Sequence, residues 1–320
     1  MKNYLVTGGA GFIGSHLIKR LLKEGNNVTT IDNLSTGFKK NIPKGTNFIK
    51  GDCGTSKVYK KLKKIKFDAI FHIAGQSSGE ISFDNPIYDI RTNTISTILL
   101  LKHALKINCK RFIFASTMSV YGFKSNKPTK ESEETLPESF YGISKLASEN
   151  YLRIFEKYGI KHTSLRLFNI YGPGQNMNNL RQGMVSIFMS QMLNQGKILV
   201  KGSSSRYRDF VYVDDVIEYF IRCLNNKKSI GKIINVGTGK KTFVKQIIKK
   251  LTSLNNNKVP VKYSGSTEGD VNGIYADVKI LKKILGKINQ TLLHEGLLKM
   301  YKSSINQITT KNSSKNITFK

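Results

Sequence analysis

A tyrosine and a lysine four positions apart, Tyr141 and Lys145, are the residues whose types and spacing point most directly to chemistry. The apolar side chains after them recur at helical spacing, so we expect both residues on one face of a helix. A tyrosine has a pKa of about 10 and is a poor base at neutral pH. A neighbouring ammonium favours the phenolate, and we expect Lys145 to lower the pKa of Tyr141. The pair is therefore a candidate general base for the hydroxyl group of a sugar or another alcohol.

A Tyr-x-x-x-Lys pair alone is common on helix surfaces, and a glycine-rich turn near the N-terminus gives this one a context. Residues 7–14 read Thr-Gly-Gly-Ala-Gly-Phe-Ile-Gly, between a predicted strand and a predicted helix. Glycines in such a turn let the backbone approach a pyrophosphate at the N-terminus of the helix. Asp32 ends the second predicted strand, where a carboxylate can hold ribose hydroxyls, and Asp52 follows the third, where one can meet an adenine ring. The turn therefore predicts a dinucleotide site.

The residues around Asp32 distinguish between the two nicotinamide dinucleotides. The carboxylate of Asp32 would repel a 2′-phosphate, and the following residues, Asn33-Leu34-Ser35, offer no arginine to hold one. We therefore expect NAD rather than NADP as the cofactor.

Strand-length apolar runs alternate with helix-period segments over the first half of the chain. The predicted strands are 4–7, 27–31, 47–50, 69–72, 111–116 and 162–167, and predicted helices include 13–21 and 95–105. Continuous apolar strands that alternate with helices indicate βαβ units and an α/β fold. We expect a Rossmann-type doubly wound parallel sheet with a smaller C-terminal substrate-binding lobe.

The alternation loosens after about residue 170, where a Gly-Pro-Gly sequence at 172–174 and a polar run at 175–182 follow. The expected organisation is an NAD-binding domain over 1–170, to which 208–240 returns in part through a strand at 232–236. Residues 171–207 and 241–301 are expected to form the substrate-binding lobe. Residues 302–320 are polar, and we expect a frayed tail.

The chain is strongly basic, with 52 Lys and Arg against 21 Asp and Glu and a formal net charge of +31 over 320 residues. Such an excess can indicate nucleic-acid binding. The lysines, however, recur along much of the chain, and there is no RNP-like aromatic–basic segment and no zinc finger. We expect a solvated basic surface that attracts a polyanionic substrate and binds no specific nucleic acid. A regulatory NAD sensor that binds nucleic acid stays open as an alternative.

Cysteines, histidines and hydropathy exclude several other classes of protein. Cys53, Cys109 and Cys223 are odd in number and scattered, which excludes a disulfide framework and fits a reducing cytoplasm. The five histidines show no metal-ligand spacing, so we expect no metal site. No run approaches 18 apolar residues, so we expect no membrane insertion.

The ordered motifs together resemble one family, the extended short-chain dehydrogenase/reductases, and within it the NAD-dependent nucleotide-sugar epimerases and dehydratases of the UDP-glucose 4-epimerase type. The resemblance covers nearly the whole chain. The segments that carry it are 7–15, 32–33, 51–52, 71–76, 116–122, 141–145, 165–174, 208–215 and 235–237.

The resemblance implies a role for individual residues. For the cofactor, it implies that the pyrophosphate is cradled by Gly8, Gly11, Phe12, Ile13 and Gly14. It implies that Asp32 and Asn33 hold the adenosine ribose and that Asp52 and Cys53 flank the adenine. It also implies that Ala74 and Gly75 pass beneath the cofactor, that Asn93 supports the site and that Lys145 reaches the nicotinamide ribose. For catalysis, it implies Tyr141 as the base and Thr117 as the hydroxyl that contacts the reacting sugar hydroxyl. For the substrate, it implies contacts from Thr117, Asn169, Arg208 and Asp270.

One short segment separates the reactions of this family. In 4,6-dehydratase relatives an Asp-Glu pair precedes Val-Tyr-Gly, whereas Met118-Ser119 stands there in this chain. Neither side chain can shuttle protons at neutral pH. We therefore expect an epimerase that inverts C4 of a UDP-hexose by transient oxidation to a ketose and re-reduction, with NAD regenerated and tightly held. A nucleotide-sugar dehydrogenase or reductase is the alternative, followed by a dehydratase.

Two departures from the family pattern and one assembly also follow from the resemblance. Many epimerases have an arginine where Thr267 stands, which leaves the nucleotide carrier open. Some 4-epimerases have a lysine near Ser77, which leaves the inverted carbon open. Relatives are often dimers through a helical bundle, so we expect a homodimer.

Overall fold

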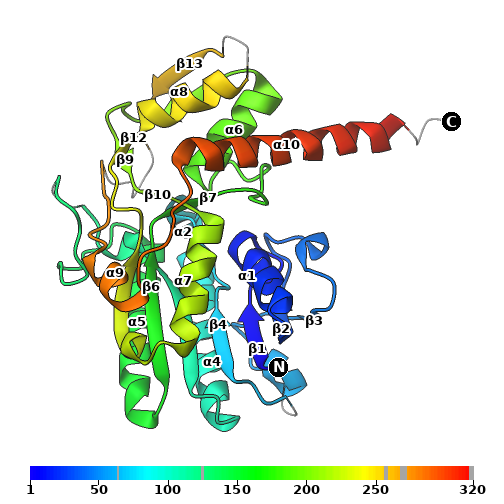
Figure 1. The fold of residues 1–320 in the computed structure, drawn as a ribbon, viewed down its shortest axis with the longest axis vertical. Coiled ribbons are helices and arrows are strands. Elements are labelled where there is room, and N and C mark those ends of the chain that lie inside the picture. Colours follow the sequence, from blue (N-terminus) through cyan, green and yellow to red (C-terminus); the bar gives the residue numbers. More distant parts are fainter. Residues whose placement is uncertain (63–64, 124–125, 256–258, 267–271, 317–320) are drawn as a thin grey trace.

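Seven parallel strands form one sheet, in the order β11-β6-β5-β4-β1-β2-β3 (Figure 1). The computed structural model describes residues 1–62, 65–123, 126–255, 259–266 and 272–316, with side chains up to residue 305. The strands are β1 (Asn3–Thr7), β2 (Asn27–Asp32), β3 (Asn47–Lys50), β4 (Ala69–His72), β5 (Arg111–Thr117), β6 (Lys161–Leu167) and β11 (Lys232–Val236). The expected doubly wound parallel sheet is confirmed, and each predicted strand lies within one residue of its predicted bounds.

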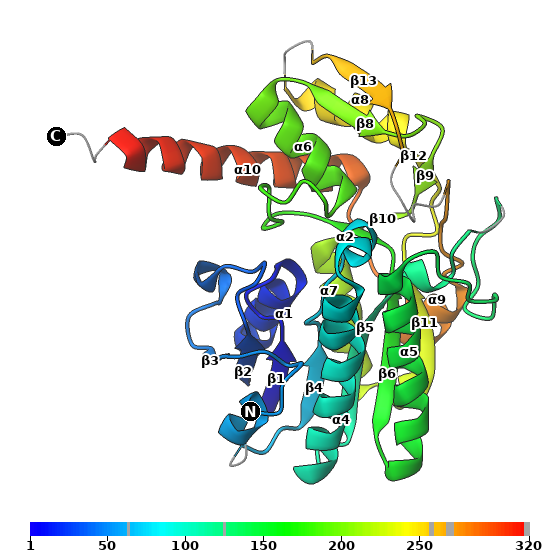
Figure 2. The same ribbon diagram turned by 180° about the vertical axis from the view of Figure 1, so that it is seen from behind.

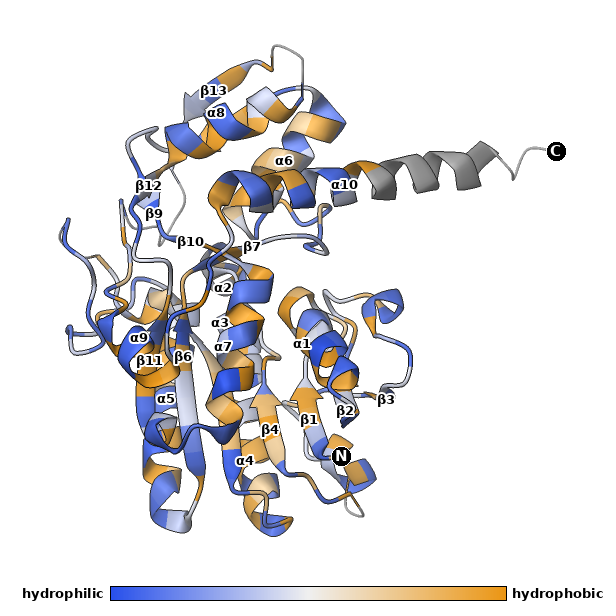
Figure 3. Cartoon of the chain, viewed as in Figure 1, coloured by the Kyte–Doolittle hydropathy of each residue, from blue (hydrophilic) through white to orange (hydrophobic). Residues whose placement is uncertain are grey.

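Helices cover both faces of this sheet because successive strand side chains point to opposite sides. In β1, Leu5 and Val6 belong to two different hydrophobic cores, and so do Ile70 and Phe71 in β4. One core also holds side chains of α1 (Phe12–Lys23) and α7 (Val213–Asn225), and the other holds side chains of α4 (Ser96–Lys106) and α5 (Phe140–Phe155). Figure 3 shows β1 and β4 as mostly hydrophobic strands, as this double burial requires.

The remaining elements of this half are short. They are α2 (Gly79–Asp84), α3 (Pro86–Ile90), a π-helical turn η3 (Arg91–Ile95), α9 (Lys279–Leu285) and the 3₁₀ turns η1 (Lys39–Asn41), η2 (Val58–Leu62), η4 (Met118–Val120), η5 (Glu156–Tyr158) and η6 (Lys227–Ser229). The strand order reverses between β1 and β4, and a ligand crevice is expected beyond the carboxyl ends of the strands at such a point.

A second group of elements lies beyond those carboxyl ends (Figure 2). It contains α6 (Met184–Gln195), α8 (Val244–Leu254) and α10 (Leu293–Asn316), with β8 (Ile198–Lys201) paired in parallel to β13 (Val261–Ser264). Two further strand pairs join the groups: β7 (Asn169–Tyr171) with β10 (Phe210–Tyr212), and β9 (Tyr207–Arg208) with β12 (Thr242–Phe243). The domain boundaries predicted from the sequence remain a proposal.

Helix α10 differs from the expected frayed tail. It runs to Asn316 and projects away from the rest of the chain in both views (Figures 1 and 2). Its first turns are held by packing, since Leu297 and Met300 are buried in the core. The helix then continues through polar residues, which a pattern search for apolar periodicity does not detect. No helix in the described ranges is long and apolar enough to cross a membrane.

A buried ion pair connects α5 to β6 of the main sheet. Glu149 and Arg166 have side chains 3% and 4% exposed, and Arg166 donates from Nε to Oε1 at 3.0 Å and from Nη2 to Oε2 at 2.7 Å. Ser116 on β5 also donates to Glu149, and the Arg166 guanidinium lies 4.6 Å from the centre of the Tyr121 ring. These bonds fix α5 against β5 and β6, the elements that carry the candidate chemistry.

We expect Arg166→Met to lower the free energy of unfolding by about 3–5 kcal/mol, because it leaves the Glu149 carboxylate buried and unpaired. Arg20→Met is the matched control, since Arg20 also pairs with a glutamate one helical turn away but is 37% exposed, and we expect about 0–1 kcal/mol there. Urea denaturation of both variants measures the difference. Equal losses would contradict the structural role of the buried pair.

Candidate active site

A cavity of about 360 Å³ lies across the carboxyl ends of the strands of the main sheet. It brings together most of the residues that the sequence predicted for the cofactor and the reaction. The predicted residues that line it are Gly8, Gly11, Phe12, Ile13, Gly14, Asp32, Asn33, Asp52, Cys53, Ala74, Gly75, Thr117, Tyr141, Lys145 and Asn169. Its position matches the crevice expected from the strand order.

The glycine-rich turn has a shape that only glycine permits. Gly8 has φ +77°, and a Cβ on it would lie 2.9 Å from the backbone of Ala74. A Cβ on Gly14 would overlap the carbonyl oxygen of Gly8. Gly11 caps α1 without a side-chain hydrogen bond, so the first N–H groups of the helix stay open toward the cavity. The turn therefore fits the pyrophosphate of a dinucleotide.

Two carboxylates stand at the ends of β2 and β3, and backbone N–H groups hold both in place. Asp32 accepts from Ala10 N at 2.9 Å and from Leu34 N at 2.7 Å. Asp52 accepts from Gly54 N at 2.7 Å and from Arg91 Nη2 at 2.9 Å. This arrangement fits the ribose and adenine of the cofactor.

Arg91, the partner of Asp52, and Cys53 also bear on how the cofactor would be held. Arg91 was not predicted, because it lies 39 residues from Asp52 in the chain. Cys53 is buried, which raises the pKa of its thiol and leaves it unreactive. Among the described residues that line the cavity, Lys145 is the single cation, so a 2′-phosphate near Asp32 has no partner there.

A hydroxyl–imidazole pair supports the loop at 73–75, which the sequence places beneath the cofactor. The Thr7 hydroxyl accepts from the N–H groups of Ile73 and Ala74, both at 3.1 Å, and therefore donates to His72 Nδ1 at 2.8 Å. His72 is fully buried, and burial followed by the charge of Lys145 lowers its pKa to about 3, so it is neutral. The sequence offered no signal for this support, since a buried histidine at a strand end resembles simple packing.

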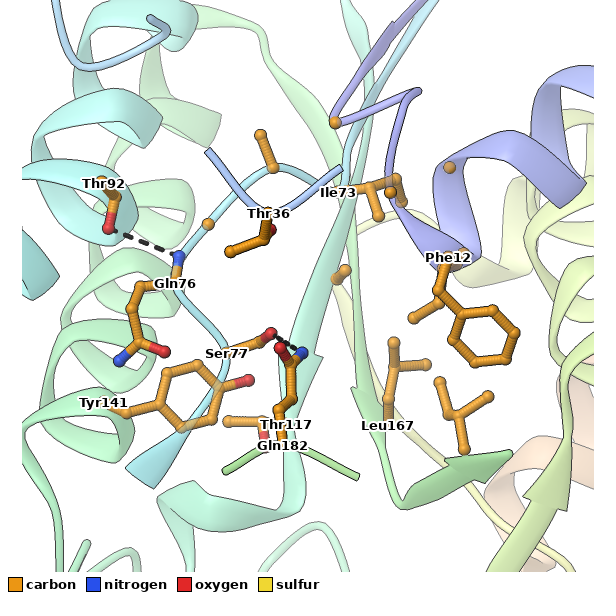
Figure 4. A pocket seen from close by; sticks show the side chains of 18 of the residues that line it. Phe12, Thr36, Ile73, Gln76, Ser77, Thr92, Thr117, Tyr141, Leu167 and Gln182 are labelled. Atoms are coloured by element: carbon orange, nitrogen blue, oxygen red, sulfur yellow. Dashed lines mark hydrogen bonds between the residues drawn. The ribbon is translucent and has the colours of Figure 1, made fainter. Parts of the chain in front are cut away.

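Tyr141, Lys145 and Thr117 meet at the other end of the cavity. Helix α5 begins at Phe140, after Ser139 caps it by accepting from Gly142 N at 3.2 Å, and it places Tyr141 and Lys145 on one face. Figure 4 shows the Tyr141 ring with its hydroxyl directed into the cavity. Lys145 Nζ donates to Ala115 O at 2.9 Å and lies 4.8 Å from the centre of the Phe114 ring.

The expected lowering of the Tyr141 pKa by Lys145 is wrong for this structure. Burial raises the pKa of Tyr141 to about 12, with a smaller opposing effect from a hydrogen bond with Thr117, and Lys145 contributes no resolved effect. The physical reason is that the ammonium is itself buried, with its Nζ directed at Ala115 O. Its own pKa falls to about 8, because burial outweighs the attraction of Asp89 and Glu149. Spacing alone cannot reveal this desolvation.

The predicted substrate residues are only partly brought together. Asn169 lines the cavity, and its buried Oδ1 has no hydrogen-bond partner among the described residues. Arg208 is buried, donates to Tyr207 O at 2.7 Å and is not among the residues that line the cavity. Asp270 lies outside the described residues, as does Thr267. Asn93 is buried behind the cavity rather than lining it.

A contact between two loop residues that line the cavity was missed from the sequence. Gln182 and Ser77 lie on different loops, 105 residues apart, and Gln182 Nε2 donates to Ser77 Oγ across the cavity (Figure 4). Isolated polar residues in loops carry no periodic signal, so only the folded chain shows that they meet.

Residues 4–237 match the family described as the NAD dependent epimerase/dehydratase family. The chain belongs to this family. It is 32% identical to the UDP-glucose 4-epimerase of Mycolicibacterium smegmatis over 302 residues, which cover 92% of this chain and 96% of that protein.

Solved structures agree with this assignment. The chain superposes on the crystal structure of the UDP-glucose 4-epimerase of Thermotoga maritima with UDP-glucose at a TM-score of 0.91 and 35% identity, covering 96% of this chain and 99% of that one. It also superposes on the Thermus thermophilus UDP-glucose 4-epimerase complex with NAD at a TM-score of 0.88 and 29% identity, covering 94% and 98%.

Within this epimerase/dehydratase family, the placement of carboxylates distinguishes the reactions. Asp32 and Asp52 are the carboxylates among the described residues that line the cavity, and both lie at the adenosine end. Near Tyr141 the lining residues are Met118 and Ser119. Ser119 is held by Thr117, to which it donates from its N–H at 3.1 Å. The described lining near Tyr141 therefore has no carboxylic acid for an elimination.

We expect Gly14→Ala to weaken NAD binding by at least about tenfold, which needs a loss of only about 1.4 kcal/mol. The new Cβ would overlap the Gly8 carbonyl oxygen and force the turn open. Gly79→Ala is the control, because a Cβ there meets Ser139 at an ordinary 3.6 Å. NADH fluorescence titration of both variants measures the change, and equal affinities would count against this turn as the cofactor cradle.

Proposed function

We propose that this protein is an NAD-dependent epimerase that inverts C4 of the hexose in a UDP-hexose. The observation that carries the proposal is the meeting of Tyr141, Lys145 and Thr117 in a cavity whose other end is built for a dinucleotide. The relatives named above are UDP-glucose 4-epimerases, which supports UDP as the carrier and C4 as the carbon. The reaction belongs to carbohydrate metabolism.

Tyr141 is the proposed base, and its neighbours define how it acts. Its phenolate would take the proton from the 4-hydroxyl of the sugar, and the resulting phenol would return that proton after the ketone is reduced from the other face. Thr117 lowers the pKa of Tyr141 and can contact the same sugar hydroxyl. When bound, NAD supplies the hydride acceptor and donor, and its oxidised ring supplies a positive charge that favours the phenolate. Lys145, on the same face of α5, would reach the nicotinamide ribose, as the resemblance implies.

The sugar end of the cavity suits a neutral hexose. Its lining includes the hydroxyl groups of Ser77 and Ser119 and the amide of Gln182, with small Gly183 beside them. These groups can exchange hydrogen bonds with sugar hydroxyls in more than one orientation. A ketose that turns over between oxidation and reduction needs such adaptable partners.

A reducing compartment fits the proposed enzyme. Cys53, Cys109 and Cys223 are free and buried. Buried free thiols are typical of proteins that work where disulfides do not form, so we propose a cytoplasmic location.

We expect Tyr141→Phe to reduce kcat by about 10²–10⁴, the usual contribution of a positioned acid–base group, without loss of bound NAD. Tyr158→Phe is the control, because Tyr158 follows the same helix but is 66% exposed. NMR of a panel of UDP-, GDP-, CDP- and dTDP-sugars identifies inverted centres.

Other results of this assay would contradict the proposal. A net change in NADH absorbance would instead identify a dehydrogenase or reductase. Unchanged turnover in Tyr141→Phe would exclude Tyr141 as the base.

We also propose that two copies of the chain pair through α3, α4 and α5. Helices α3 and α4 and the turn η3 contact α5, and α4 and α5 lie side by side in Figure 2. A group of large apolar side chains on α3, η3 and α5 is exposed. The group consists of Ile87, Ile90, Ile95, Phe140, Ile143, Tyr151 and Ile154. Ile87 is 75% exposed and Ile143 is 50% exposed, and a second copy of the same surface would cover them.

We expect Ile143→Asp to convert the homodimer to a monomer, because it places a carboxylate in the centre of this apolar surface. Leu199→Asp is the control, since Leu199 is 40% exposed on β8, far from these helices. Light scattering coupled to size-exclusion chromatography gives the mass of each variant. A wild-type monomer, or an unchanged Ile143→Asp dimer, would rule out this interface.

A further inference from the structure

A buried carboxylate that the proposed reaction does not use lies directly behind the active site. Asp89, near the end of α3, has no exposed surface. Its Oδ1 accepts from Gln76 Nε2 at 2.9 Å and from Asn93 Nδ2 at 3.1 Å. Both partners are neutral amides, so these contacts do not neutralise the negative charge.

Asp89 and the backbone of Gln76 together determine how the Asn93 amide is turned. Asn93 Nδ2 donates to Asp89 Oδ1 and also to Gln76 O at 3.0 Å. A carbonyl oxygen can only accept, so the NH₂ group must face these two atoms and Oδ1 must face the other way. The orientation of Asn93 is therefore set by its partners.

The Asn93 oxygen and the Lys145 ammonium both lie near Gly75. A Cβ built on Gly75 would overlap Asn93 Oδ1 and would lie 3.4 Å from Lys145 Nζ, so both atoms face the same point beside Gly75. Asn93 Oδ1 is buried and has no hydrogen-bond partner among the described residues. Gly75 itself lines the cavity beside Lys145.

The charged and titratable groups around Lys145 come from several elements. On its own helix, Tyr141 is neutral at pH 7 and Glu149 is already paired with Arg166. On β4, His72 is neutral. On α3, Asp89 attracts the ammonium. Asp89 is therefore a carboxylate near Lys145 whose hydrogen-bond partners Gln76 and Asn93 carry no positive charge.

We propose that Asp89 is a positioning residue of the active site: it turns the Asn93 amide oxygen toward Lys145 and serves as the counter-ion of the Lys145 ammonium. The role of Asp89 as counter-ion depends on the proposed function only in the experiments that measure turnover. Removal of the Asp89 charge leaves the buried ammonium less stable, so Lys145 loses its proton at a lower pH. If turnover needs the Lys145 ammonium, the loss of activity on raising the pH then begins at a lower pH than in the wild-type protein.

The test compares NAD-loaded wild-type protein with Asp89→Asn, which keeps an acceptor oxygen and nearly the same volume. Proton-detected NMR of protein with ¹⁵N-labelled lysine follows the titration of Lys145, and Lys145→Met identifies its signal. We expect the midpoint to fall by about one pH unit, which lowers the protonated fraction about tenfold above both midpoints. The alkaline limb of the kcat–pH profile should move by the same amount, with kcat near pH 6.5 changed much less.

Two further variants keep the result interpretable. Asp84→Asn is the control, because Asp84 is an exposed carboxylate on neighbouring α2 that pairs with Arg181, and we expect no shift. If Asp89→Asn does not retain NAD, Asp89→Ser is measured in its place.

The outcomes separate this inference from the proposed function. An unchanged Lys145 midpoint in the neutral variant, or an equal shift in Asp84→Asn, overturns the role of Asp89 as counter-ion. A shifted midpoint in a protein that turns over no nucleotide sugar supports Asp89 and overturns the proposed function instead.

Discussion

Burial of the Lys145 ammonium is the constraint on which the rest of the site depends. A cation that is 3% exposed loses most of its hydration, and the protein must replace that loss. The replacements come from different elements: the Ala115 carbonyl and Phe114 ring on β5, and the charges of Asp89 on α3 and Glu149 on α5. Lys145 therefore interacts with β5, α3 and α5 at the place where these three elements meet.

The same burial acts on both members of the Tyr-Lys pair, and it favours the neutral form of each. It raises the pKa of Tyr141 to about 12 and lowers the pKa of Lys145 to about 8. The protein without cofactor therefore holds a protonated tyrosine, which is a poor base. A cationic ring beside the tyrosine changes that balance, so in the proposed reaction the base becomes effective only when the cofactor is in place.

Predictions from the sequence succeeded where a single segment carries the physical requirement. The strands were found because each is a short apolar run, and the turn at Gly8–Gly14 because its backbone excludes side chains. They failed where distant segments meet. The donor–acceptor contact of Gln182 with Ser77 and the direction of the Tyr141 pKa depend on packing that no local pattern encodes. The helical continuation of α10 through polar residues was missed for lack of apolar periodicity.

The family resemblance pointed to Asn93, but no sequence pattern pointed to Asp89, which lies just before the π-helical turn η3. A regular helix predicts which residues share a face, and a π turn inserts a residue that breaks this periodicity. Here the turn spans Arg91–Ile95 and carries Asn93 at its centre. Asn93 donates a hydrogen bond to Asp89, and Gly75 lies between Asn93 and Lys145. Such a turn has poorer hydrogen-bond geometry than a regular helix, and here it lies where Asn93 approaches the buried ammonium beside Gly75.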